Sequence, residues 1–381
     1  MVASGVRPWV GEGGRVSSDR RARLIRLSAL LQGAPHLVPS YEEAKRIVRA
    51  FRKPAFYEVA TRCNLFCEGC YYFSDDFKPI ESVEDIGTWD RFFAAEAERG
   101  VTMAYFVGAE PALHQDRLIA ASKYFPYGNI GTNGTVRIDP AVPYRIGVSV
   151  WGVDADTDAD LRGGRSFHKA IRNYAGDPRA ILLYTLTKTN LGDARRLAEI
   201  GRDNGLPVTF NMYSPTHTYL RKLTEGEGND RQFFRISNPD SNLLWDDDSL
   251  ARVRRTLDDL IDAFPETVVY SKAYNAWATQ SGPLYDIDPE TGIARDCHSR
   301  MIGQMRYFKT DLQQGQEKCG TSDAVCSECR MYSGGWSSKF EPRDADLVSE
   351  ASLADWLEMI ATLGRIFLIE RDASRQATLA A

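Results

Sequence analysis

Between residues 55 and 213 the chain alternates strand-like runs with helix-like stretches. The strand-like runs are AFYEVAT (55–61), TMAYFVG (102–108), NIGTN (129–133), YRIGVSVW (144–151), AILLYTLT (180–187) and PVTFNMY (207–213). Helical patterns lie between most of them, at 86–98, 114–123 and 192–204, and another follows at 248–263. Strands that alternate with helices predict a parallel sheet. Six such units favour an α/β fold built as a partial (β/α)6 barrel. A doubly wound sheet remains the alternative fold.

The segments around this region have other patterns. Residues 1–17 are rich in Gly and Ser and are expected to be mobile. Two helical patterns follow at 18–32 and 40–51, and Ser40 with Glu43 predicts a capping box that opens the second helix. We therefore expect an N-terminal extension (1–53) before the barrel.

After residue 265 the rhythm changes. Residues 304–320 predict a β-hairpin with a Gly-containing turn, and a helix is expected at about 352–370. We expect a barrel domain (54–265), a small C-terminal α+β module (266–345), and a final helix and tail (346–381).

Residues 214–247 form a long stretch with weak periodicity. Loops of that length in compact domains are usually functional or disordered. Because this stretch follows the sixth strand, we expect it to cover the active site, with Arg221, Lys222 or Arg235 facing polar groups of the substrate. The alternative is a disordered surface excursion.

Composition indicates an ordinary soluble protein. Of the 381 residues, 43% are hydrophobic and 26% charged, and the net charge of −5 gives no sign of nucleic-acid binding. The start of the chain lacks the apolar core of a secretory signal. The most hydrophobic late segment, 353–369, contains Asp355, Glu358 and Arg365, which predicts an amphipathic helix. We expect a cytoplasmic protein without membrane or nucleic-acid partners.

The chain has seven cysteines in two groups. An odd number in a large chain without a secretory signal favours metal or redox chemistry over disulfides. The first group, CNLFCEGC, contains Cys63, Cys67 and Cys70 directly after the first strand-like run, where parallel sheets bind ligands. Structural zinc needs four protein ligands. A 4Fe–4S cluster held by three cysteinates instead keeps one iron open to a small molecule.

The C-x3-C-x2-C triplet, followed by GAEP at 108–111, resembles the radical S-adenosylmethionine (radical SAM) superfamily. The resemblance implies that Cys63, Cys67 and Cys70 hold a catalytic 4Fe–4S cluster whose open iron chelates S-adenosylmethionine. It further implies that the methionine amino group lies at the GAEP loop. The other implied cofactor contacts come from GTNG, SVWG and LRGG, and the full set is Tyr72, Gly108, Ala109, Glu110, Asn133, Ser149 and Arg162.

The chain departs from the family pattern at Gly69, where many members carry an aromatic residue before the third cysteine. Contact with the adenine is therefore expected from the backbone and from Tyr72. Arg162 is expected to bind a cofactor carboxylate, because guanidinium groups bind carboxylates through two hydrogen bonds.

The second group comprises Cys297, Cys319, Cys326 and Cys329. With the expected hairpin, it resembles the twitch or SPASM extension of radical SAM proteins, which implies one auxiliary 4Fe–4S cluster. The C-x2-C end leaves zinc as an alternative. We expect all four cysteines to bind the cluster; if one is free, it should be Cys297, which the hairpin separates from the others.

The resemblance implies an enzyme that cleaves S-adenosylmethionine reductively to a 5′-deoxyadenosyl radical, which removes a hydrogen atom from a substrate. A flavodoxin- or ferredoxin-type protein would supply electrons. The expected substrate is a small polar metabolite of a biosynthetic pathway (a sugar, cyclitol or nucleoside), which is oxidised, epimerised or rearranged. The alternatives are a maturase that modifies a ribosomal peptide and a non-enzymatic electron carrier or regulator. The GAEP and LRGG motifs argue against the carrier.

Overall fold

The computed structural model describes residues 18–73, 81–225, 232–301 and 305–369. The expected mobile start at 1–17 lies outside the described residues. Within them, no helix is both long and apolar enough to cross a bilayer.

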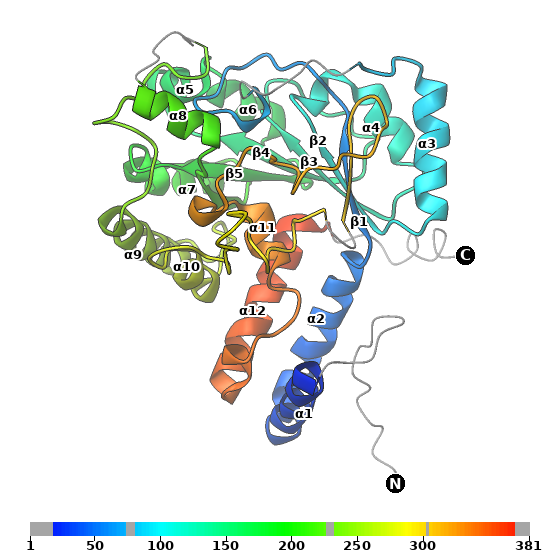
Figure 1. The fold of residues 1–381 in the computed structure, drawn as a ribbon, viewed down its shortest axis with the longest axis vertical. Helices are drawn as coiled ribbons and strands as arrows, with labels where there is room; N and C mark the ends of the chain where they lie inside the picture. The colour runs from blue at the N-terminus through cyan, green and yellow to red at the C-terminus, as the bar shows by residue number, and fades with distance from the viewer. Residues whose placement is uncertain (1–17, 74–80, 226–231, 302–304, 370–381) are drawn as a thin grey trace.

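A seven-stranded sheet forms the centre of the molecule, and all its strand pairs are parallel (Figure 1). The strand order is β6-β5-β4-β3-β2-β1-β7. The first six strands therefore follow one another in chain order, which confirms the six predicted strands and the partial barrel. A doubly wound sheet would reverse this order at its switch point. The strands are Pro54–Glu58 (β1), Met103–Val107 (β2), Tyr127–Thr132 (β3), Arg145–Val150 (β4), Ala180–Leu186 (β5), Val208–Met212 (β6) and Arg306–Phe308 (β7).

Helices connect most of the strands, as parallel pairing requires. All seven residues of β5 are buried, as expected for a strand covered on both faces. Between β3 and β4, the described residues 133–144 contain no helix. The connecting helices are Ile86–Glu98 (α3), Gln115–Ala121 (α4), Ala155–Arg162 (α5), Phe167–Tyr174 (α6) and Ala194–Asp203 (α7), and Asp247–Ala263 (α9) and Lys272–Ala278 (α10) follow β6.

Three terminal helices project together from the sheet (Figure 1). They are Ser18–Gly33 (α1), Val38–Ala50 (α2) and Glu350–Phe367 (α12). Helices α2 and α12 pack closely, since a Cβ atom on Gly364 would lie 2.7 Å from Ile47 Cδ1. The predicted capping box is wrong, because α2 begins at Val38 without any side-chain cap and carries Pro39 in its first turn. Proline is well tolerated there, where its missing N–H costs no helical hydrogen bond.

The predicted hairpin is correct only in part, and its first residue, Gln304, lies outside the described residues. Its first arm forms β7, which pairs in parallel with β1. The return arm makes a single bridge to the first arm, between Phe308 and Gln314. The edge of β1 offers unpaired backbone groups, and β7 pairs with them. A segment expected in the C-terminal module thus extends the barrel sheet. A further short helix, Tyr332–Ser337 (α11), follows the last cysteine.

Candidate cofactor and substrate site

One cavity of about 330 Å³ is lined by all the cysteines and all the cofactor-contact residues that the sequence singled out. It is lined by strand residues of the sheet, by the loop after β1 and by the chain after residue 285. All seven cysteines line it. So do Tyr72, Gly108, Ala109, Glu110, Asn133, Ser149 and Arg162. The structure therefore brings together two cysteine groups that are more than 220 residues apart in the chain.

The loop that carries the first three cysteines is fastened by its backbone. Phe66 N donates to Arg162 O at 2.9 Å, and Glu68 N donates to Leu161 O at 2.8 Å, both at the end of α5. Gly69 N donates to Phe233 O at 2.7 Å. A loop held on two sides keeps its thiols in fixed positions, as a metal site requires.

These thiols are half-buried and close to one another. Burial raises the pKa of Cys63, and together with the nearby Cys67 it raises the pKa of Cys70 to about 12. Such thiols stay protonated at neutral pH unless positive charge compensates them, and a bound metal provides that charge. Asn133 Nδ2 lies 3.6 Å from Cys63 Sγ, which places a hydrogen-bond donor beside this group.

Glu110, at the end of β2, is the most buried acid of the site, with 1% of its surface exposed. It accepts hydrogen bonds from Ala112 N at 2.9 Å, Thr132 Oγ1 at 2.6 Å and Asn133 N at 2.7 Å. Burial raises the pKa of Glu110, and these bonds oppose the rise. The carboxylate is thus held rigidly in the cavity wall and keeps lone pairs for a cationic ligand.

Gly108 starts the GAEP loop in a conformation that favours glycine. Its φ is +125°, and a Cβ atom there would lie 2.6 Å from the backbone oxygen of Ala60. The close approach of two strand ends therefore requires glycine at this position.

Arg162 is the last residue of α5 and only 2% exposed. One of its terminal nitrogens donates to Ser149 O. Its Nε atom is buried and has no hydrogen-bond partner among the described residues. An unpartnered guanidinium nitrogen beside a cavity is costly unless a ligand accepts from it. A carboxylate fits this position best, as expected for Arg162.

The structure explains the departure at Gly69. This glycine has φ +59°, and a Cβ atom there would lie 2.0 Å from the hydroxyl oxygen of Tyr213. Tyr213, after β6, thus occupies the space of a side chain at position 69, and no local pattern predicted this contact. Tyr72 lines the cavity, but its hydroxyl donates to Ala60 O at 3.1 Å and lies 3.4 Å from Glu58 Oε2.

The second cysteine group gathers at the same cavity. Cys326 and Cys329 flank one 3-10 turn, and Cys319 pairs with Arg300 through a backbone bridge. Burial, with a contribution from the nearby Cys329, raises the pKa of Cys297 to about 12 and that of Cys319 to about 11. Cys297 therefore lies beside the other cysteines, although the chain separates them.

The arrangement of the thiols bears on which metal group they can hold. Among the described residues, no three Cys, His, Asp or Glu side chains are close enough to hold a single metal ion. Zinc needs every sulfur within about 2.3 Å. A 4Fe–4S cluster binds each thiolate at a different iron, so its ligands stand further apart. Groups of three and four thiols beside one cavity supply the sulfur ligands that two clusters would need, and zinc at the second group stays the alternative.

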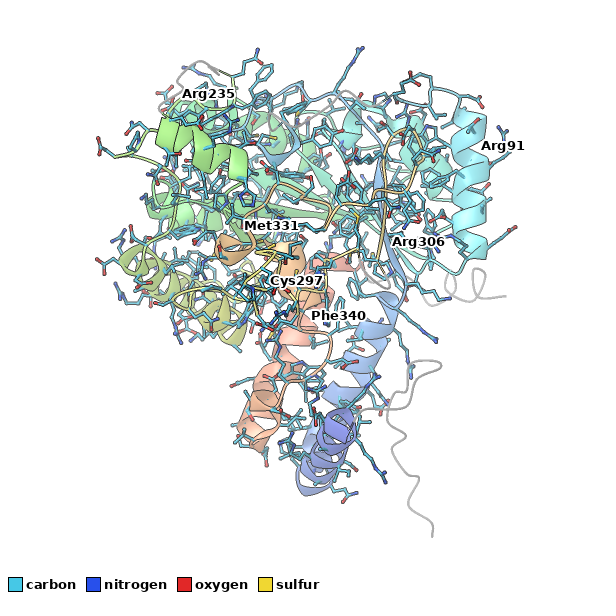
Figure 2. All side chains as sticks on the ribbon, in the orientation of Figure 1. Arg91, Arg235, Cys297, Arg306, Met331 and Phe340 are labelled. Carbon is cyan, nitrogen blue, oxygen red and sulfur yellow. The ribbon has the colours of Figure 1, made fainter. Side chains whose placement is uncertain are left out.

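Residues 214–247 differ from the expected cover. They include a helix, His217–Glu225 (α8), and residues 226–231 lie outside the described part. Arg221 pairs with Glu225, and Arg235 donates to the backbone oxygens of Phe66 and Asp160. Neither arginine lines the cavity, and neither does the buried Lys222. Figure 2 shows Arg235 at the rim of the molecule, far from Cys297 and Met331 near its centre. The expectation that these residues face substrate is wrong.

The segment instead binds the outside of the cysteine loop. Glu68 is fully buried, and its carboxylate accepts from the backbone nitrogens of Arg235 at 2.7 Å and Ser237 at 3.1 Å. The segment therefore braces the loop from outside the cavity.

No protein-family model and no curated protein matches the sequence. Several solved structures have a similar fold. Streptococcus suis SuiB bound to S-adenosylmethionine has 14% identity and a TM-score of 0.48, and the match covers 68% of this chain and 58% of SuiB. The anSMEcpe protein with bound AdoMet and Cp18Cys peptide has 14% identity and a TM-score of 0.46, covering 76% of this chain and 84% of anSMEcpe. HydG, a maturase of the [FeFe]-hydrogenase, has 11% identity and a TM-score of 0.38, and the match covers 60% of this chain and 55% of HydG. At these identities the likeness concerns the fold.

Proposed function

We propose that the chain is a radical SAM enzyme that acts on a small organic substrate, with an auxiliary iron–sulfur cluster in its C-terminal part. The observation that carries this proposal is the single cavity on which both cysteine groups and all seven implied cofactor residues converge. An electron carrier would have no use for the buried carboxylate and guanidinium beside the first cysteines.

Each side of the cavity has a separate role. Cys63, Cys67 and Cys70 would hold the catalytic cluster. Glu110 would bind the amino group of S-adenosylmethionine, and Arg162, through its unpartnered Nε, the carboxylate. When bound, the cluster and S-adenosylmethionine supply the 5′-deoxyadenosyl radical that removes a hydrogen atom from the substrate. The protein orients the reactants and excludes water.

The second group would hold the auxiliary cluster through Cys297, Cys319, Cys326 and Cys329. With four protein ligands, no iron is open to the substrate, so this site would exchange electrons at a distance. That arrangement favours an oxidation of the substrate, because a substrate radical must then lose an electron. Epimerisation or rearrangement, and a peptide in place of a small metabolite, are the other outcomes of the same chemistry. A flavodoxin- or ferredoxin-type donor in the cytoplasm would provide the reducing electron.

Product analysis tests the proposal directly. Anaerobically reconstituted protein is incubated with S-adenosylmethionine and dithionite, and 5′-deoxyadenosine is measured by chromatography. We expect 5′-deoxyadenosine from the native chain and none from a variant with Cys63, Cys67 and Cys70 changed to Ala, which should keep about four irons out of about eight. Cofactor cleavage that persists in the triple variant contradicts the proposal.

A further inference from the structure

One row of side chains crosses the sheet below the level of the cofactor residues. In the register of the sheet, Tyr307 on β7 pairs with Phe56 on β1, Phe56 with Tyr105 on β2, and Tyr105 with Asn129 on β3. All four residues line the cavity. Tyr105 precedes Gly108 by three residues, so the row lies about 10 Å below the GAEP loop along the strands.

Aromatic rings form a continuous wall along this row. The ring centroids of Phe56 and Tyr105 are 4.5 Å apart with an interplanar angle of 15°, and those of Phe56 and Tyr307 are 6.0 Å apart. Phe367 at the end of α12 contacts Tyr105 edge-on and stacks on Tyr332 at 5.5 Å. Both residues line the cavity as well. Such a wall binds planar rings by stacking and edge contacts.

Polar groups without partners stand among these rings. Asn129 lines the cavity, and only 5% of its surface is exposed. Its side-chain amide makes no hydrogen bond to the described residues. The hydroxyls of Tyr105 and Tyr332 likewise have none there. Burial and the nearby Tyr332 raise the pKa of Tyr105 well above its usual value, so this hydroxyl stays neutral. A ligand group can therefore bond to the Asn129 amide, which has both a donor and an acceptor to offer.

Between the row and the GAEP loop, the floor of the cavity is flat. Gly131 on β3 pairs with Gly147 on β4, and both line the cavity. A Cβ atom on Gly131 would meet nothing within 4 Å, and one on Gly147 only the backbone oxygen of Ile130 at 3.7 Å. This pair leaves open space of the kind that a flat ring occupies.

In the part of the chain that the structure describes, no charged side chain of this part of the wall lines the cavity; Glu58, which accepts from the Tyr307 hydroxyl, is not among the lining residues. The charged side chains among the described lining residues are Glu110, Arg162, Arg300 and Lys318. The first two belong to the cofactor side and the last two to the surroundings of Cys319. The row itself therefore suits an uncharged ring.

We propose that this row is the substrate subsite and takes a planar, uncharged aromatic ring that carries a hydrogen-bonding group. The inference rests on the proposed function and narrows its substrate class. A nucleobase and the side chain of a tyrosine share this chemistry, whereas a bare sugar or cyclitol lacks it. The ring lies against Phe56 and Tyr105, over the two glycines, and its polar group bonds to the Asn129 amide.

Binding measurements on reconstituted protein, saturated with S-adenosylmethionine and left unreduced, test this subsite. The probes are uridine and N-acetyl-L-tyrosinamide, and the ring-free controls are myo-inositol and N-acetyl-L-leucinamide. At least one ring probe should bind at least tenfold more tightly than both controls, and the one that does identifies the source of the ring. Equal affinities for all four probes, or no binding of either ring probe, overturn the proposal. Saturating cofactor excludes binding at the adenine position.

Variants locate the binding in the row. Asn129→Leu should lower the affinity for the ring probe about tenfold, as expected for one lost hydrogen bond of about 1.4 kcal/mol. Tyr105→Phe removes only a hydroxyl without a partner, so the fold is kept, and affinity should fall severalfold. Gly131→Val fills open space and should abolish binding. Tyr124→Phe, whose hydroxyl instead bonds to Asp90 at 2.8 Å, is the control. Unchanged affinity in Asn129→Leu and Gly131→Val overturns the proposal.

Cofactor cleavage is measured separately in the same variants. If a ring probe binds in the row but no 5′-deoxyadenosine forms, the proposed function fails and the subsite stands. If 5′-deoxyadenosine forms but neither ring probe binds, the enzyme class stands and the subsite fails.

Discussion

The carboxylate of Glu68 accepts a hydrogen bond of 2.7 Å from the backbone nitrogen of Arg235, 167 residues further along the chain. This contact ties the loop of the first three cysteines to the segment after β6. Removing a buried charged acceptor leaves backbone donors without partners.

Glu68→Gln should therefore lower the free energy of unfolding by about 1–3 kcal/mol and accelerate cleavage of the cysteine loop by a protease. Denaturant titration and limited proteolysis measure the two effects. Glu98→Gln, on the exposed side of α3, is the matched control and should change neither. Equal stability of the Glu68 and Glu98 variants would contradict the bracing role.

Arg162→Lys should weaken the binding of S-adenosylmethionine at least tenfold, because lysine keeps the charge but loses the fork that binds a carboxylate. Equilibrium dialysis gives the affinity. Arg165→Lys changes an exposed arginine three residues away and should leave the affinity unchanged. Unchanged affinity in Arg162→Lys would show that the charge alone is sufficient, and a loss of similar size in both variants would indicate a general effect on this part of the fold.

Gly108→Ala should destabilise the protein by about 1–3 kcal/mol and lower cofactor affinity, because the added Cβ meets Ala60 O at 2.6 Å and φ is +125°. Gly131→Ala makes the same change where nothing lies within 4 Å and should be tolerated. Thermal unfolding of the two variants side by side checks this. If Gly108→Ala were as stable as Gly131→Ala, the strain argument would be wrong.

Stability should also depend on pH through Lys339. Burial, with a contribution from Arg343, lowers the pKa of Lys339 to about 7, while its ammonium lies 3.6 Å from the centroid of the Trp277 ring. Between pH 7 and the usual lysine pKa, the unfolded chain binds a proton that the folded chain does not. The free energy of unfolding therefore rises with pH in this window, by at most about 1.4 kcal/mol per pH unit.

Lys339→Met should be more stable than the native chain at pH 7, and this advantage should shrink towards pH 9. Denaturant titrations at pH 7, 8 and 9 measure it. Lys169→Met, at an exposed position of α6, should show no such trend. An advantage that stays constant with pH would indicate that Lys339 is charged throughout, held by the Trp277 ring.

Cys297→Ala tests whether all four late cysteines bind the second cluster. If all four late cysteines bind one cluster, this variant should alter the electron paramagnetic resonance spectrum of the second cluster and leave that of the first unchanged. A second-cluster spectrum identical to the native one would show that Cys297 is free. Four irons with one zinc per native chain would exclude an auxiliary cluster.

Local patterns were enough to predict the strands and the cysteine site. β-Branched and aromatic runs bounded by turn residues predicted six strands, and the spacing of Cys63, Cys67 and Cys70 placed the first cysteines at the carboxyl end of β1. The resemblance of two short motifs to a known family singled out Glu110 and Arg162; both line the cavity, and their roles stay predictions.

The contacts that were missed depend on partners far away in the chain. Nothing local shows that residues 306–308 pair with β1 or that Tyr213 fills the space beside Gly69. The sequence predicted that Arg235 faces the substrate, but its side chain donates hydrogen bonds to the backbone oxygens of Phe66 and Asp160. Ser40 with Glu43 matched a capping box, but Pro39 fits the first turn of a helix that starts earlier. The row from Tyr307 to Asn129 appears only once the register of the sheet is known.

The pairing of β7 with β1 has a consequence for how the protein is made. The hydroxyl of Tyr307 donates to Glu58, which lies 249 residues earlier in the chain. During synthesis, the first cysteine loop leaves the ribosome long before the strand that closes its side of the sheet. Domains fold as they emerge, so the barrel strands assemble with one edge and the adjoining cavity wall still open. The nascent chain therefore leaves this side of the first cysteine loop open until residues 306–308 have emerged, and any metal group that the three thiols hold would gain its closed wall only then.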